Sequence, residues 1–289
     1  TMVGQLSSSF VSSLRNGDVF LLGGSTYRVS SIRGTRVNVS PATGYRPTIP
    51  SWTGEANSRT HELSQEVLEL LEEVATYARL EKDPMTIFTD ILGLNRPVAH
   101  AVSGFFQEHV ATTFQVPSND LILVEQVEAP LPTYIVTTCR GRAFNLALGH
   151  LFAGIATNDN IIVHELSFDE NGFMIKLSHE VEISLIPEIF KQGNSKDVLQ
   201  KHMMESQLFA KRFREISSRS MLNPRRIGAE EVSPKQFQQR AEQIMQKHRQ
   251  MDDSVLIRET MNEILHADLD MAQLEIFINR MDSEDVRIV

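Results

Sequence analysis

The stretch LILVEQVEAPLPTYIVTTCRGRAFNLALGHLFAGIATNDNIIVHELSFDENGFMIKL, residues 121–177, carries the clearest fold signal in the chain. Short runs rich in β-branched and aromatic residues predict four strands. These runs cover residues 121–127, 134–138, 161–166 and 173–177. A longer apolar run predicts a helix over 144–156, and Asn171-Gly172 is a strong hairpin signal between the last two strands. Strands that are interrupted by one helix indicate an α+β fold.

Helical patterns lie on both sides of this stretch. On its N-terminal side, apolar residues between Leu63 and Val74 recur at three- and four-residue spacing, which predicts an amphipathic helix with a glutamate-rich outer face. Asp83-Pro84 is typical of a helix start, and we expect helices to about Leu92 and over 97–114. From residue 184 the chain reads as successive helices, one of which begins with the capping box Ser233-Pro234-Lys235-Gln236. Residues 286–289 predict a short last strand.

The N-terminal part has a different pattern. Over residues 17–40 short strands alternate with glycine turns, which indicates a small β-barrel or a curled sheet, and residues 41–58 predict a long loop. We therefore expect two domains. A β-barrel-like module with a tryptophan loop would cover residues 1–58, and an α+β domain would cover 59–289, mixed over 59–182 and mostly helical over 183–289.

Composition and charge fit a folded protein with local basic patches. The chain has 289 residues, of which 41% are hydrophobic and 22% charged, with a single cysteine, Cys139. No signal peptide and no apolar run of transmembrane length is present, so we expect a soluble, intracellular, cytoplasmic protein with no membrane partner. The formal net charge is −9, yet residues 1–60 and 200–249 are basic. Such patches favour phosphate binding, although ordinary mixing of surface charge is the alternative.

Motifs for catalysis are absent from the sequence. There is no phosphate loop of the Gly-x-x-x-x-Gly-Lys-Ser/Thr type, no His-Glu-x-x-His pair and no Gly-x-Ser-x-Gly elbow. We therefore expect no catalytic residue, no metal and no cofactor in this chain, and no ATPase activity from it alone.

Trp52 is the first candidate for nucleic-acid binding. It lies in a loop that two prolines stiffen, and an indole held in this way can stack on a nucleobase. Its alternative role is a core anchor that pins the loop, because tryptophan is usually well buried. Basic residues around it in the sequence would meet phosphates. They are Arg28, Arg33, Arg36, Arg46 and Arg59.

Two further basic stretches leave alternatives open. Arg140 and Arg142 flank Gly141 between a strand and a helix, where guanidiniums and backbone N–H groups suit a phosphate, or where the arginines are simply solvated in a turn. The run from Lys211 to Arg226 either tracks a strand or pairs with neighbouring acidic segments. Phe209, Phe213 and Ile216 would form the core-facing stripe of its helix.

Six stretches, taken in order, resemble the Lhr (large helicase-related) family of superfamily 2 helicases, and the archaeal branch fits best. They are residues 4–24, IPSWTGE at 49–55, PSNDLILVE at 117–125, RGRAFNLAL at 140–148, residues 209–226 and LIRETMNEIL at 256–265. Thr138-Cys139-Arg140 departs from the family's usual Phe-Gly, which leaves the role of that turn open.

The resemblance implies the C-terminal part of the core of an ATP-dependent helicase. That helicase would move 3′ to 5′ on DNA or an RNA–DNA hybrid, in DNA repair or recombination. ATP and magnesium would bind motor domains in cis, outside this chain. In the family, the tryptophan matching Trp52 stacks on a base of the tracking strand. The resemblance thus implies an accessory region that grips single strands. A protein-interaction or scaffold module that docks partners through its acidic helices is the alternative.

Overall fold

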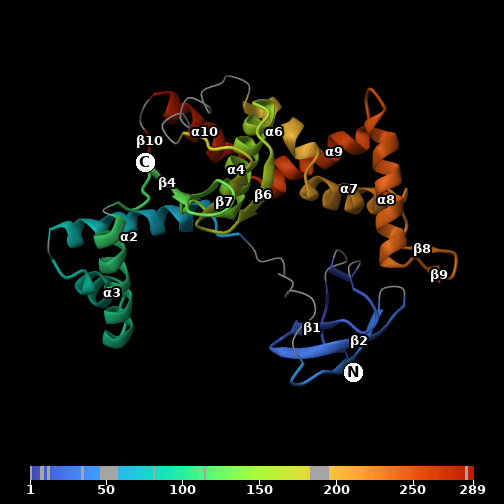
Figure 1. Cartoon of the computed structure of the whole chain (residues 1–289), viewed down its shortest axis with the longest axis horizontal. Coiled ribbons are helices and arrows are strands. Elements are labelled where there is room, and N and C mark those ends of the chain that lie inside the picture. The colour runs from blue at the N-terminus through green and yellow to red at the C-terminus, as the bar shows by residue number, and fades with distance from the viewer. Residues whose placement is uncertain are drawn as a thin grey trace. The chain divides into compact units, whose positions relative to one another are not determined.

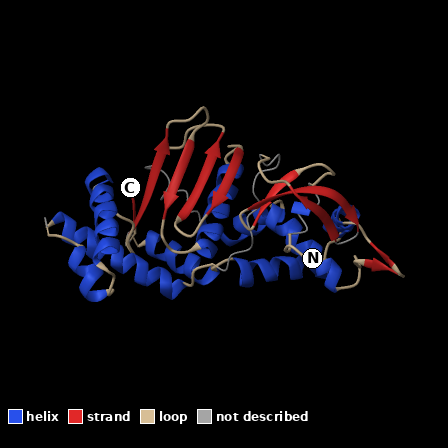
Figure 2. Cartoon of the chain, turned by 90° about the horizontal axis from the view of Figure 1, so that it is seen from below, coloured by secondary structure: helices blue, strands red, loops and turns tan. Residues whose placement is uncertain are grey.

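The computed structural model describes residues 2–6, 10–11, 14–33, 36–45, 58–80, 82–113, 115–182, 195–283 and 286–289. The chain divides into two compact units. Unit 1 comprises Thr1–Asn57 and Glu205–Ile264, and unit 2 comprises Ser58–Met204 and Leu265–Val289. Residues 205–264 thus group with the N-terminal residues, whereas the sequence analysis assigned them to the domain over 59–289. Both units contain helices and strands, so the α+β class is confirmed (Figures 1 and 2).

Unit 2 is built on a five-stranded sheet of order β10-β4-β5-β7-β6. Its strands are β4 (Leu121–Val127), β5 (Thr133–Thr137), β6 (Val163–Phe168), β7 (Gly172–Leu177) and β10 (Arg287–Ile288). β10 runs parallel to β4, and the other neighbours are antiparallel. The four predicted strands of residues 121–177 are therefore confirmed, as is the short C-terminal strand. The Asn171-Gly172 hairpin is also present: Asp169 Oδ1 accepts from both backbone N–H groups of this turn at 2.8 Å.

Helix α4 (Arg142–Asn158) is the central helix of unit 2. It packs against β6, β7, α6 (Ser195–Met204) and α10 (Met271–Asp282). Because neighbours surround it, it is apolar on nearly all sides, and every residue from Ala147 to Ala156 is buried. This explains why the sequence shows a continuous apolar run here rather than an amphipathic pattern.

The glutamate-rich helix is α2 (His61–Arg79), and it connects the sheet to a second helical layer. Val74 packs in a cluster with Ile87, Phe88 and Ala99, which belong to the π-helical turn η1 (Ile87–Ile91) and to α3 (Arg96–Thr113). In Figure 1, α2 begins close to the sheet and extends away from it towards η1 and α3. The three predicted helices of this region are confirmed, with the second reduced to a short turn.

The N-terminal strands of unit 1 form an open sheet. β1 (Val19–Leu22), β2 (Ser25–Arg33) and β3 (Arg36–Pro41) pair antiparallel in the order β1-β2-β3. No closed barrel is present in the described ranges, so the expected barrel-like module is not confirmed. The curled-sheet alternative is closer, because one face carries the core residues Phe20 and Val29 against the segment around Leu14.

Three helices follow in unit 1: α7 (Gln207–Arg219), α8 (Pro234–Arg249) and α9 (Val255–Glu263). The π-helical turn η3 (Ile264–Asp268) comes next in the chain and lies in unit 2 except for its first residue. α7 packs on both α8 and α9. A small hairpin of β8 (Arg226–Ile227) and β9 (Glu230–Glu231) connects α7 to α8. The capping box at Ser233 is confirmed: its hydroxyl accepts from the Gln236 backbone, and the Gln236 side chain accepts from the Ser233 backbone.

Candidate nucleic-acid interface

The β2–β3 hairpin presents three of the predicted arginines on one face. Along the two strands, core residues such as Val29, Ile32 and Val39 point to one side. A bulge between Val29 and Ser31 shifts the alternation by one residue, so that Ile32 rather than Arg33 faces the core. Arg28, Arg33 and Arg36 therefore lie on the opposite face. The sequence showed only an imperfect two-residue period here, and the bulge is the physical reason.

Arg33 and Arg36 lie directly opposite each other at the end of this hairpin, and both are exposed. Like charges in such a cross-strand pair destabilise a sheet. Neither guanidinium has a hydrogen-bond or ion-pair partner within the described part of the chain. An anion between them would relieve the repulsion, so the pair is suited to a phosphate. Arg28 is half-buried, and its guanidinium lies 4.4 Å from the centre of the Tyr45 ring.

Arg59, by contrast, binds groups of its own chain. Its guanidinium donates to the carbonyl oxygens of Cys139 at 2.9 Å and Glu170 at 3.0 Å, and to Ser64 Oγ at 3.2 Å. These bonds fix the start of α2 against the turn before α4. The turn approaches so closely that a Cβ on Gly141, which has a φ of 91°, would lie 3.0 Å from Arg59 O. Gly141 is therefore required by both conformation and space.

Arg140 is buried between two phenyl rings. Its guanidinium lies 5.4 Å from the ring centres of Phe144 and Phe277, and it donates to Asn119 O at 2.7 Å. Its Nε has no hydrogen-bond partner among the described residues. Burial, and then the nearby Arg280, lower the pKa of Arg140 to about 10, while Asp120 acts in the opposite direction. These contacts hold the segment before β4 against α4 and α10.

Arg142 also has partners within the chain. Its guanidinium donates to Phe168 O at 2.6 Å, and its backbone N–H donates to the Glu170 carboxylate at 3.0 Å. Glu170 thus occupies the helix N-terminus where a phosphate was expected. A role for Arg59, Arg140 and Arg142 in strand binding stays a prediction, but hydrogen bonds account for all three without one.

Trp52 and Arg46 lie in residues 46–57, outside the described residues. The predictions for this loop, including the stacking indole, therefore stay predictions.

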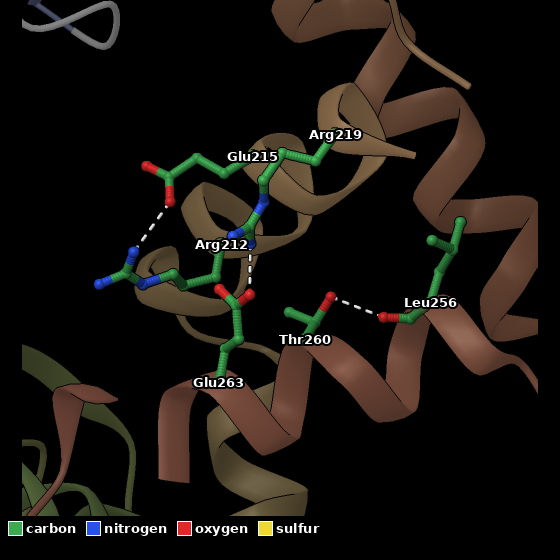
Figure 3. Close-up of polar contacts among 6 residues, drawn as sticks. All are labelled: Arg212, Glu215, Arg219, Leu256, Thr260 and Glu263. Carbon is green, nitrogen blue, oxygen red and sulfur yellow. Dashed lines mark hydrogen bonds and ion pairs between the residues drawn. The ribbon is translucent and has the colours of Figure 1, made fainter. Parts of the chain in front are cut away.

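The basic run on α7 pairs with carboxylates. Arg212 bonds Glu215 on the same helix at 2.9 Å, and Arg219 reaches Glu263 on α9, as Figure 3 shows. Beside this ion pair, the hydroxyl of the fully buried Thr260 donates to Leu256 O at 2.7 Å within α9 (Figure 3). Phe209, Phe213 and Ile216 are buried, as predicted. Of the two alternatives for this run, pairing with acidic segments is the one that the contacts favour.

Unit 2 contains two further arginines that the sequence analysis did not single out. Arg79 at the end of α2 and Arg287 in β10 line one polar pocket. Each lies in an acidic part of the sequence, and only the fold places both at one pocket. Among the described residues, no group of three or more His, Cys, Asp or Glu side chains is placed to hold a metal ion. No described helix combines the length and apolar character that crossing a membrane requires.

Comparison with known proteins identifies the family of this chain. Residues 116–289 match the model of the DEAD/H associated family. The chain belongs to the DEAD/H-associated family. Residues 1–49, which contain β1–β3, match the model of the winged helix domain of the large helicase-related protein. The resemblance to Lhr helicases is confirmed.

Relatives of this DEAD/H-associated chain are longer helicases. It is 28% identical to the ATP-dependent helicase Lhr-Core protein 2 of Thermococcus barophilus and 26% identical to the Lhr-Core helicase of Saccharolobus solfataricus, with 99% of this chain and 34% of each relative covered. It is also 26% identical to the Lhr helicase/uracil glycosylase of Escherichia coli, of which it covers 18%. The chain thus spans about a third of the length of the Lhr-Core relatives.

A solved structure supports the fold. The chain matches the Mycobacterium smegmatis helicase Lhr bound to ssDNA and AMP-PNP with a TM-score of 0.69 and 22% sequence identity, over 85% of this chain and 32% of that one. The DEAD/H-associated match contains the Arg140–Arg142 turn and all of α7, whereas the β2–β3 hairpin lies in the winged-helix match. Residues 61–113, with α2 and α3, lie between the two matches.

Proposed function

We propose that this chain is the nucleic-acid-gripping accessory region of an ATP-dependent helicase that moves 3′ to 5′. The observation that carries the proposal is the match of nearly the whole chain to a third of each Lhr-Core helicase. The chain has no phosphate loop, so ATP and magnesium would bind motor domains in cis. DNA repair or recombination is the process in which we expect the helicase to act.

We assign strand binding to the outer face of the β2–β3 hairpin and to the Trp52 loop. Arg33 and Arg36, which are exposed and have no ion-pair partner among the described residues, are suited to backbone phosphates, and Arg28 beside Tyr45 extends the basic face. Base stacking by the indole would hold the strand between phosphate contacts. A motor needs such fixed contacts because a strand that slips during a hydrolysis cycle is not advanced. Single-stranded DNA or an RNA–DNA hybrid is the proposed partner.

The proposal is tested by fluorescence anisotropy with a labelled single-stranded oligonucleotide. The double variant Arg33→Gln/Arg36→Gln should weaken binding about tenfold, since each lost phosphate contact costs about 0.5–1 kcal/mol. Arg258→Gln is the matched control, because Arg258 is an exposed arginine on α9 that pairs with Asp253. Equal affinity of the double variant and the wild type would reject the hairpin as the grip.

A second candidate function rests on a different observation. On α3, Val98 and Phe105 are 45% and 66% exposed, and α2 next to it carries an exposed row of glutamates. Apolar side chains exposed beside acidic ones are typical of a protein-docking surface. A scaffold function would be supported if the Arg33→Gln/Arg36→Gln variant kept full strand affinity while Phe105→Ala abolished co-purification with a partner protein.

A further inference from the structure

Two arginines on and after α7 differ from their neighbours in the same basic run. Arg212 pairs with Glu215 at 2.9 Å (Figure 3). Arg214 on the same helix and Arg225 just before β8 have no hydrogen-bond or ion-pair partner for their guanidiniums in the part of the chain that the structure describes. Both residues lie in unit 1. The pairing of this run with carboxylates therefore does not extend to these two residues.

Arg214 is a buried charge without an ion pair. It is only 9% exposed, on a face of α7 that also buries Ser217. A charged side chain that leaves water normally needs a partner, because desolvation disfavours its charged form. Burial lowers the pKa of Arg214, the Glu215 carboxylate acts in the opposite direction, and the charge of Arg225 lowers it further. Since that carboxylate is bonded to Arg212, the described residues leave the N–H donors of Arg214 to another anion.

The fold fixes the backbone on both sides of Arg225. The Asn223 backbone N–H donates to Ser217 O on α7 at 2.9 Å, and Asn223 Nδ2 donates to Phe237 O on α8 at 3.0 Å. The Arg225 carbonyl oxygen accepts from the Val232 N–H at 2.9 Å. The Arg225 guanidinium lies over the Phe237 ring, 5.3 Å from its centre, and this stacking does not use the N–H donors in its plane. A site that is held in place before its ligand arrives loses little entropy on binding.

Two guanidiniums whose charges repel each other are suited to an anion that binds both. Each guanidinium can donate two parallel hydrogen bonds, and a phosphate has enough oxygens to accept from both groups. We propose that Arg214 and Arg225 bind a phosphate group where α7, α8 and the segment before β8 meet. The phosphate belongs either to the backbone of a nucleic-acid strand or to a small phosphate compound. The site uses no residue of the β2–β3 hairpin and does not rest on the proposed function.

Two titrations of the full chain test the site. The first uses inorganic phosphate and isothermal calorimetry, and the second uses a labelled single-stranded oligonucleotide and anisotropy. Arg225→Gln is the test variant, because Arg225 is exposed and its backbone bonds remain. Arg225→Lys keeps the charge without the two-pronged geometry. Arg258→Gln is the control, since it makes the same change of charge at an exposed arginine of the same unit.

We expect Arg225→Gln to weaken the binding of inorganic phosphate at least about fivefold, with an intermediate loss in Arg225→Lys and none in the control. A loss of oligonucleotide affinity greater than that of the control identifies a strand as the source, and an equal affinity identifies a small phosphate compound. The proposal is overturned if inorganic phosphate does not bind the wild type, or binds the wild type and Arg225→Gln equally. A wild type that binds phosphate here but no oligonucleotide contradicts the proposed function alone.

A second variant, Arg214→Met, tests the buried half of the site by thermal melting. Methionine keeps an unbranched side chain and removes the charge. In phosphate-free buffer we expect a melting temperature no lower than that of the wild type, because no ion pair is lost. Inorganic phosphate at constant ionic strength should raise the melting temperature of the wild type and not that of Arg214→Met. A marked drop in phosphate-free buffer, or an equal rise with phosphate in both proteins, would overturn the assignment of Arg214 to the site.

Discussion

Two groups of arginines that looked alike in the sequence have opposite surroundings in the fold. Arg33 and Arg36 at the β2–β3 hairpin are exposed and face each other across two strands. Arg59, Arg140 and Arg142 converge on the turn before α4, where carbonyl oxygens of their own chain accept their N–H groups. Within the described residues, the guanidiniums of the first group make no hydrogen bond, whereas each guanidinium of the second group donates to at least one carbonyl oxygen. The position of an arginine near a turn or a helix start therefore does not decide whether it is available to a ligand.

The comparison also separates what each group contributes. An exposed pair of like charges lowers the stability of the sheet that carries it. Replacing Arg33 and Arg36 should therefore weaken strand binding without lowering the free energy of unfolding. A guanidinium that donates hydrogen bonds to buried carbonyls stabilises the fold. Its removal should therefore lower the free energy of unfolding and leave strand affinity unchanged. Each of the following experiments measures one side of this contrast.

The largest effect is expected for Arg59→Ala. The change removes three side-chain hydrogen bonds and leaves the Cys139 and Glu170 carbonyls without this donor. We expect the free energy of unfolding to fall by about 4 kcal/mol, because charged hydrogen bonds to partly buried groups contribute about 1.5–3 kcal/mol each and are not additive. Urea denaturation measures the loss. A variant that keeps its stability but binds strands poorly would move Arg59 into the group of ligand-binding arginines.

Acid should lower the free energy of unfolding of unit 2. His150 on α4 packs against Phe168 and against His202 of α6, and its Nδ1 has no hydrogen-bond partner in the described part of the chain. Burial, and then His202, lower the pKa of His150 to about 4 from an ordinary value of 6.5. Between pH 6.5 and 4, His150 is therefore protonated in the unfolded chain and neutral in the folded chain. The stabilising contribution is complete above pH 6.5 and is lost as the pH falls from there towards 4.

The loss from His150 amounts to about 3 kcal/mol across that window, at about 1.4 kcal/mol for each unit of pKa difference. Chemical denaturation from pH 7.5 to 4.5 measures it, with His150→Gln as the variant in which the slope is reduced. His202, whose pKa burial also lowers, accounts for the slope that remains. An identical pH profile in the variant would show that His150 does not contribute.

A smaller effect, about 2 kcal/mol, is expected for Trp52→Ala, and it should appear in strand binding. One stacked base contributes about 1–3 kcal/mol. The loop around Trp52 is polar, with Thr48, Ser51 and Thr53 near it in the sequence, so we expect little change in the melting temperature. A core anchor would instead cost about 3–5 kcal/mol of stability. A large drop in melting temperature with unchanged strand affinity would therefore assign the indole to the core.

Local sequence patterns predicted most of the secondary structure correctly, because those patterns are set by burial. The run 121–127 is a strand with both faces covered over its first four residues, and the helix over 144–156 is extended by only two residues at each end. The grouping of the elements was not predictable in this way. Whether α7–α9 belong with residues 1–57 depends on contacts between distant segments, which leave no periodicity in the sequence.

The candidate site was predictable only in part, for a related reason. The residue type of Arg140 suggested a phosphate contact, but its neighbours Phe144 and Phe277 lie at different distances along the chain, and the second is invisible to local analysis. The bulge after Val29, which turns Arg33 outward, left only a broken alternation. Arg79 and Arg287 carried no motif at all, since a pocket formed by distant elements requires none.

The salt dependence of single-strand binding tests the central claim most directly. If the hairpin and its loop meet about three or four phosphates, the logarithm of the association constant should fall with the logarithm of salt concentration with a slope of about −2 to −3. In Arg33→Gln/Arg36→Gln the slope should become shallower by about 1.4, at about 0.7 for each phosphate on a single strand. A slope near zero in the wild type, or the same slope in both proteins, would contradict the account.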